Sequence, residues 1–175
     1  MLETSPPPLR AARLRGLAPD GVDTGGRRVL TGLADGSRTA PPAARTLALP
    51  PATSWRPGLV VCETSFDEAL TLTPGVVFGG WIACLADHFA GLVMLSAIPD
   101  GTGFLTAGLS VDYHAPLLPG PVRIETELTS CSTRRAVAEI RFVQHSTRTC
   151  TGTVEQIIHR TAPAAATDRK ADRAS

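Results

Sequence analysis

The sequence lacks the cysteine and histidine patterns that hold metals in small domains. Its four cysteines, Cys62, Cys84, Cys131 and Cys150, form no CxxC pair, and the four histidines stand far from them at irregular spacings. Because a structural zinc site needs ligands at short, regular spacings, this pattern gives no support for a zinc cage. We therefore expect no metal, and four free thiols in a reducing cytoplasm.

The chain also has little excess charge of either sign. Its 17 basic and 16 acidic residues leave a net charge of +1 over 175 residues, which gives no electrostatic basis for binding nucleic acid or an anionic membrane. A single lysine, Lys170, stands among the basic residues beside abundant Ala, Gly and Pro, a composition typical of a GC-rich bacterial genome. No apolar run of signal-peptide length follows the first residues, so we expect a cytoplasmic protein.

Several catalytic motifs are missing as well. The sequence contains no GxGxxG, P-loop, HExxH or GxSxG pattern and no repeat with a period of 20 to 50 residues. Nucleotide-binding and serine-hydrolase assignments therefore lose most of their support.

Composition divides the chain into three parts. Residues 1–50 hold clustered prolines and the Gly25-Gly26 pair without sustained periodicity, which predicts an arm that is partly loose or draped over the core. Residues 51–161 carry the periodic segments of one domain. Residues 162–175 are small and charged, and predict a disordered tail.

The most informative segment is an apolar stretch over residues 74–98, opened by Gly79 and Gly80, with Asp87 in its middle. Its length approaches the roughly 20 residues that span a bilayer, but an acid at the centre of such a span costs about 2.5–3.5 kcal/mol. We therefore favour a buried core helix. A buried carboxylate needs a partner or a chemical role, so Asp87 is the leading functional candidate.

Strand patterns surround this helix. Residues 59–66 predict a strand before it, and after it residues 109–114, 122–129, 135–144 and 149–159 alternate apolar and polar side chains with period two. The short polar turns between the last three are typical of antiparallel neighbours. We predict an α+β fold in which an antiparallel sheet of about five strands wraps around one long central helix.

The order of elements, the segment GVVFGGWIACLAD and the later TAGLSVDYHAPLLPG together resemble the hotdog-fold acyl-thioesterases of the phenylacetic-acid (PaaI-like) type. The resemblance covers roughly residues 55–160. Members of that family open the central helix with His-Gly-Gly, place an acid eight residues after the first glycine, and follow with a strand that bears a Ser or Thr. The matching positions here are Gly79, Gly80, Asp87 and Thr106, with a Pro-x-x-x-Gly turn at residues 116–120.

This resemblance implies three catalytic residues and no cofactor beyond the coenzyme A of the substrate. Asp87 is expected to act as general base on a water or as a nucleophile, Gly79 to supply an oxyanion hole at the helix start, and Thr106 to orient the acid or the water. A rise of 1.5 Å per residue separates Gly79 from Asp87 by about 12 Å along one helix. If both act on one thioester carbon, the acid must come from a second subunit, so we expect a homodimer, with a dimer of dimers as the alternative.

Two positions depart from the family pattern. Phe78 stands where the family usually has His, and residues 71–73 stand where an Asn or Gln is often found. Phe78 and Trp81 are candidates for lining an acyl pocket, and the turn arginines are candidates for binding the phosphates of coenzyme A. The expected substrate-binding residues are Phe78, Gly80, Trp81, Arg134 and Arg135.

The leading function is hydrolysis of an acyl thioester carried on coenzyme A or on an acyl-carrier protein. The alternative, favoured by Phe78, is a non-catalytic module that binds acyl-CoA or acyl-carrier protein. A hotdog dehydratase fits less well, because it would need a catalytic His paired with an acid and no His opens the helix. His88 points about 100° away from Asp87 on the helix, so we interpret it as a core or interface residue.

Overall fold

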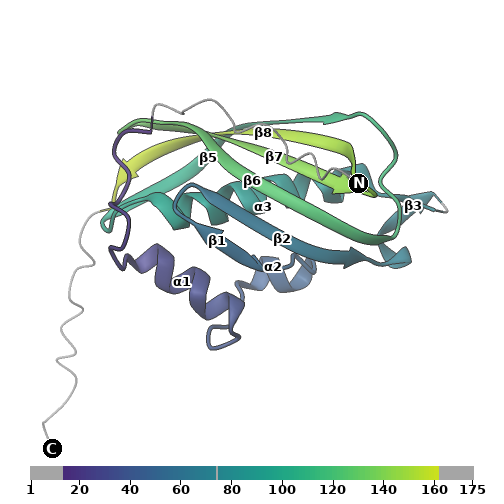
Figure 1. Ribbon diagram of the computed structural model, residues 1–175, viewed down its shortest axis with the longest axis horizontal. Coiled ribbons are helices and arrows are strands. Elements are labelled where there is room, and N and C mark those ends of the chain that lie inside the picture. The colour runs from purple at the N-terminus through teal and green to yellow at the C-terminus, as the bar shows by residue number, and fades with distance from the viewer. Residues whose placement is uncertain (1–13, 74, 162–175) are drawn as a thin grey trace, which may run out of the picture.

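The computed structural model describes residues 14–73 and 75–161, and in these a curved sheet wraps around one long helix (Figure 1). Two shorter helices lie against the side of that helix which the sheet leaves open. The helices are α1 (Gly25–Ala34), α2 (Pro42–Thr46) and α3 (Gly79–Ala97), with a short 3-10 turn at Glu68–Leu70. The strands are β1 (Ser54–Arg56), β2 (Leu59–Phe66), β3 (Thr71–Thr73), β4 (Val76–Val77), β5 (Thr102–Tyr113), β6 (Gly120–Cys131), β7 (Arg135–Gln144) and β8 (Thr147–Arg160).

The main sheet has six strands in the order β1-β2-β6-β7-β8-β5, and every neighbouring pair is antiparallel. Strands β3 and β4 form a separate two-stranded ribbon before α3. This arrangement confirms the predicted α+β hotdog architecture. The sixth strand, β1, was not predicted, because three residues are too few to show a period.

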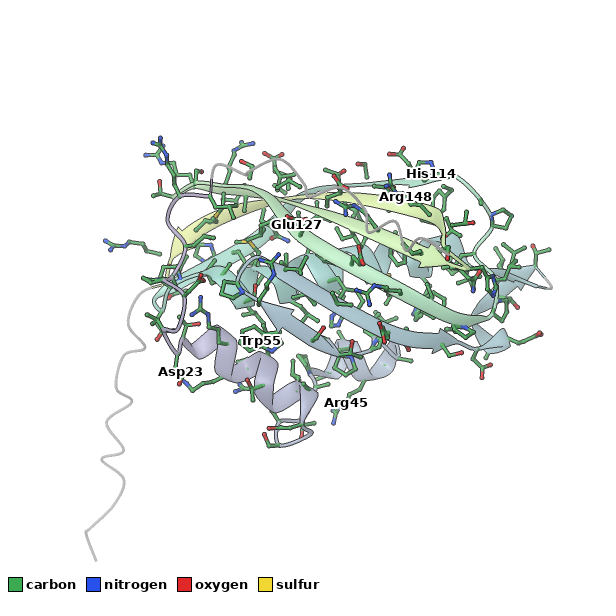
Figure 2. The ribbon with its side chains drawn as sticks, in the orientation of Figure 1. Asp23, Arg45, Trp55, His114, Glu127 and Arg148 are labelled. Atoms are coloured by element: carbon green, nitrogen blue, oxygen red, sulfur yellow. The ribbon has the colours of Figure 1, made fainter. Side chains whose placement is uncertain are left out.

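Period-two alternation divides the sheet into an inner and an outer face. Along β6, Val122, Ile124 and Leu128 are buried against α3, whereas Arg123 and Glu127 alternate with them. Figure 2 shows Glu127 on the outer surface of the sheet. Because charged residues on the outer face alternate with apolar residues on the inner face, a strand such as β6 could be predicted from the sequence.

Helix α3 forms the centre of the core. Its side chains that touch the sheet, among them Leu85, Phe89 and Val93, are fully buried. By length and composition α3 could cross a bilayer, but 61% of its most apolar window is buried inside the domain. It is therefore the core helix of a folded domain, as predicted.

Within the described residues, the N-terminal arm contacts the end of β6 at Leu14 and Arg15, and it contacts α3 from Ala18 onward. Thr24 caps α1 by accepting a hydrogen bond from the Arg27 amide. The buried Arg27 guanidinium donates to the backbone carbonyls of Ala18 and Pro19 and, at 3.0 Å, of Ser96 in the last turn of α3. Because cations are favoured at a helix C-terminus, this residue fixes the arm to the end of α3. The predicted features of residues 1–13 and 162–175 lie outside the described residues.

Candidate active site

Asp87 and Thr106 meet at the junction of α3 and β5. The Thr106 hydroxyl donates a hydrogen bond of 2.6 Å to Asp87 Oδ1. The prediction that Asp87 is buried is wrong for the single chain, because this carboxylate is exposed. Asp87 lies on the same stripe of α3 as Gly80, Cys84 and Gly91, which the sheet does not cover. Because these three residues are small and uncharged, the sequence pattern did not distinguish this stripe from the buried faces of the helix.

Gln156 on β8 extends this contact inward. Its side chain is 1% exposed, and its Nε2 donates to Thr106 Oγ1 at 3.1 Å. An amide nitrogen only donates, so Thr106 accepts from Gln156 and its one proton is left for Asp87. Gln156 was not predicted as a site residue, although the period of β8 places its side chain on the inner face of the sheet with Val154 and Ile158.

The start of α3 carries unpaired backbone donors. The Trp81 and Ile82 amides donate to Phe78 O, and Phe78 supplies no side-chain cap. Within the described residues, the free N–H groups of the first turn are those of Gly79 and Gly80. The Tyr113 hydroxyl donates to Gly79 O at 2.7 Å and ties the end of β5 to this turn.

An apolar cavity of about 500 Å³ adjoins Asp87 and Thr106. One wall comes from α3 and β5, through Leu92 and Phe104. The opposite wall comes from the arm, through Leu33 and Leu47. This volume lies in the range of roughly 300–1,000 Å³ that is typical of small-molecule sites.

Two further groups at this cavity differ in chemistry. His88 is half-buried and its Nε2 lies 3.0 Å from Pro50 O, so Nε2 carries the proton because a carbonyl only accepts. Burial lowers the pKa of His88, against smaller opposing effects of the Pro50 carbonyl and Asp87. Cys84 is the exposed cysteine, whereas Cys62, Cys131 and Cys150 are buried free thiols.

The structure places the other predicted substrate-binding residues apart from this cavity. Trp81 is buried, stacks edge-to-face on Phe66 at 4.8 Å and donates from Nε1 to Leu47 O, so it is a core residue that also holds the arm. Arg134 lies in the turn between β6 and β7, and Arg135 pairs with Glu155 on the outer face of the sheet. Neither arginine lines the cavity beside Asp87.

Phe78 and Gly80 lie together at the helix start. The Phe78 ring is 48% exposed and covers Gly80 so closely that a Cβ at that position would collide with it. The sequence could not have shown this contact, because it depends on the Phe78 side-chain rotamer. Within the described residues no cluster of three or more His, Cys, Asp or Glu side chains is arranged to hold a metal ion.

Comparisons with known proteins agree with this fold. Residues 74–151 match the model of the thioesterase superfamily. A thioesterase from Haemophilus influenzae aligns with a TM-score of 0.66 at 14% identity, over 77% of this chain and 93% of that one. A phenylacetic acid degradation-related protein from Ralstonia eutropha aligns with a TM-score of 0.64 at 20% identity, over 73% and 98%.

A thioesterase-like protein from Streptococcus pneumoniae, crystallised with coenzyme A, aligns with a TM-score of 0.56 at 22% identity, over 64% of this chain and 87% of that one. No curated protein sequence matches the chain. At these identities the solved structures establish the fold, and the sequence match over residues 74–151 shows a similarity to the thioesterase superfamily in that part of the chain. The chain therefore has the hotdog fold of these structures, and its residues 74–151 are similar to the thioesterase superfamily.

Proposed function

We propose that this protein hydrolyses acyl thioesters of coenzyme A or of an acyl-carrier protein, at a site shared between two subunits. The observation that carries the proposal is the hydrogen bond from Thr106 to Asp87 at the mouth of an apolar cavity. It supplies an oriented carboxylate beside a space for an acyl chain, which is what the hydrolysis of a lipophilic thioester requires.

Asp87 acts through its second oxygen. Thr106 occupies Oδ1, and among the described residues no donor bonds to Oδ2. This oxygen either removes a proton from a water that attacks the thioester carbon, or attacks that carbon itself to form a transient anhydride. In both routes the C–S bond breaks, the thiolate leaves with its electron pair, and a proton from water converts it to the free thiol. In the second route a water then hydrolyses the anhydride, which releases the carboxylic acid and regenerates the Asp87 carboxylate.

The oxyanion of the tetrahedral intermediate is stabilised by the Gly79 N–H at the positive end of the α3 dipole. Because Gly79 and Asp87 are about 12 Å apart along one helix, the two groups come from different subunits. The edge of β5 supports this arrangement. Among the described residues no strand pairs with this edge, and it carries the exposed side chains of Leu105, Leu109 and Tyr113. A second copy paired along that edge would cover them.

The direct test is thiol release from a panel of acyl-CoAs and acyl-carrier proteins by wild type and by Asp87→Asn. We expect release by wild type and a loss of several orders of magnitude in the variant, with unchanged circular dichroism. Asparagine keeps the size of the side chain and can still accept from Thr106, so the loss would report the carboxylate charge. Equal release by the two proteins would refute the role of Asp87.

A non-catalytic acyl-binding module is the second candidate, and Phe78 in place of the family's histidine favours it. That module would bind acyl-CoA without releasing thiol, and Asp87→Asn would leave the binding intact. A dehydratase is disfavoured by His88, whose Nε2–H is already held by Pro50 O.

A further inference from the structure

The N-terminal arm supplies about two fifths of the residues that line the cavity beside Asp87. Leu33 on α1, Leu47 at the end of α2 and Leu49 face Leu92 and Leu95 of α3 across it. Figure 1 shows α1 and α2 along the open side of the wrap, next to α3. Residues 55–160, which resemble the family, would by themselves leave this side of the cavity without a wall.

The arm is held in place at both ends. At one end Gly26 packs against α3 so closely that a Cβ there would collide with the Leu95 carbonyl oxygen, and Arg27 bonds to Ser96 O at 3.0 Å. At the other end Leu47 O accepts from Trp81 Nε1 at 2.9 Å, and Pro50 O accepts from His88. Four contacts to one helix make the arm a fixed wall.

The residues that line the cavity determine which kind of group can bind in it. Among the described residues that line the cavity there is no lysine or arginine, and the single carboxylate, Asp87, stands beside Thr106 at its mouth. The phosphates of coenzyme A therefore find no partner inside. Aliphatic side chains predominate, and Phe104 is the one phenyl ring among the described lining residues, so the space suits a flexible alkyl chain better than a stacked aromatic ring.

We propose that the arm forms the acyl-chain wall of the active site and restricts this enzyme to aliphatic acyl groups of medium length. The inference rests on the proposed thioesterase function, because it places the thioester carbon at Asp87. From there the alkyl chain runs between α3 and the arm, toward Leu33 and Leu47. These two residues set the chain length, since they lie on the wall that faces α3.

The test compares kcat/KM for straight-chain acyl-CoAs from acetyl to myristoyl, using the full chain. Each buried methylene contributes about 0.8 kcal/mol, which is about a fourfold gain in kcat/KM at 1.36 kcal/mol per tenfold, until the cavity is full. Leu47→Trp and, independently, Leu33→Phe fill the cavity from the arm. Each should move the optimum to a shorter acyl group and lower the ratio of long-chain to short-chain kcat/KM by roughly 15-fold, the equivalent of two methylenes.

The matched control is Val22→Trp, which adds the same ring to the same arm at a 46% exposed position outside the cavity. It should leave the chain-length profile unchanged. If wild type releases thiol but Leu47→Trp and Leu33→Phe lower kcat/KM equally for every acyl length, the arm is not the acyl wall and the inference is overturned, while the proposed function stands.

Binding of non-hydrolysable alkyl-CoA thioethers, measured by calorimetry, separates the two claims. If wild type releases no thiol but binds longer thioethers more tightly, and the two variants lose that dependence, the proposed hydrolysis fails and the arm remains the wall of an alkyl site. If affinity does not depend on chain length in wild type, the inference is overturned whatever the activity.

Discussion

The Thr106 hydroxyl lies 2.6 Å from Asp87 Oδ1 and 3.1 Å from Gln156 Nε2, and so links an exposed carboxylate to a buried amide. The chain of donors runs in one direction, from the amide to the hydroxyl to the carboxylate. Because of this direction, the Thr106 hydroxyl points its proton at Asp87 Oδ1 and holds that carboxylate oxygen in place. The other oxygen is thereby oriented for the reaction.

Replacement of Thr106 tests the outer half of this chain. Thr106→Val keeps the shape and removes the hydroxyl, whereas Thr106→Ser keeps the hydroxyl. Because a hydrogen bond to a charged group contributes about 1.5–3 kcal/mol, we expect kcat/KM to fall by roughly 10- to 150-fold in Thr106→Val. Thr106→Ser should stay near wild type. If the two variants behave alike, the hydroxyl does not contribute.

Replacement of Gln156 tests the inner half. Gln156→Leu removes the donor that orients Thr106 and keeps a side chain of similar size at the cavity wall, so kcat should fall several-fold while KM changes little. Once Thr106→Val is present, Gln156→Leu should have no further effect on kcat. Additive losses in the double variant would show that Gln156 acts by another route.

The four cysteines should differ in reactivity. Burial, with a smaller effect of Glu63, raises the pKa of Cys62 to about 11, and burial also raises the pKa values of Cys131 and Cys150. Cys84 is exposed and lines the cavity beside Asp87. Alkylation of the native protein should therefore modify Cys84 first, because thiolate character and access control the reaction.

Modification of Cys84 should also inhibit thiol release, and a medium-chain alkyl-CoA thioether should protect against both effects. Peptide mass spectrometry locates the modified residue, and Cys84→Ala provides the resistant control. If Cys84 reacts fully without loss of activity, the alkyl chain does not pass this part of α3.

His88 should make the protein less stable in mild acid. Burial lowers its pKa in the folded state below the ordinary value of 6.5, so the unfolded chain binds the proton more readily. Its contribution to stability is fully present above pH 6.5 and is lost as the pH falls through the lowered folded-state pKa. Tm measured across that range should fall more in wild type than in His88→Gln, whose amide can still donate to Pro50 O. Parallel curves would contradict this assignment.

The elements with a clean period were predictable from sequence, and the contacts between them were not. The glycine pair at Gly79 marked the start of α3, and alternation marked β6, β7 and β8. Asp87 was expected to be buried because an all-apolar helix does not reveal which stripe the sheet leaves uncovered. The helices α1 and α2 of the arm were not predicted, because each is too short to show a sustained period. The position of the arm depends on the single contacts of Gly26, Arg27 and Leu47 with α3, which no period reveals.

The proposed hydrolysis depends on the pairing of Asp87 from one subunit with Gly79 from another. Gly79→Pro removes the N–H of the first helical position, where proline is well accepted, and Phe78 already has the extended backbone that precedes a proline, with ψ at 119°. Gly79→Ala adds a Cβ but keeps the N–H, and is the matched control. Homodimers of Gly79→Pro and of Asp87→Asn should both be nearly inactive, whereas Gly79→Ala should retain most of the activity.

The most direct measurement is the activity of mixed dimers, purified with two affinity tags, that contain one Asp87→Asn subunit and one Gly79→Pro subunit. A shared site predicts that both defects fall in one of two equivalent sites, which leaves the other intact and restores about half of the wild-type turnover. Mixed dimers no more active than either parent homodimer would contradict the account, because they would mean that Gly79 and Asp87 of one subunit do not act in different sites.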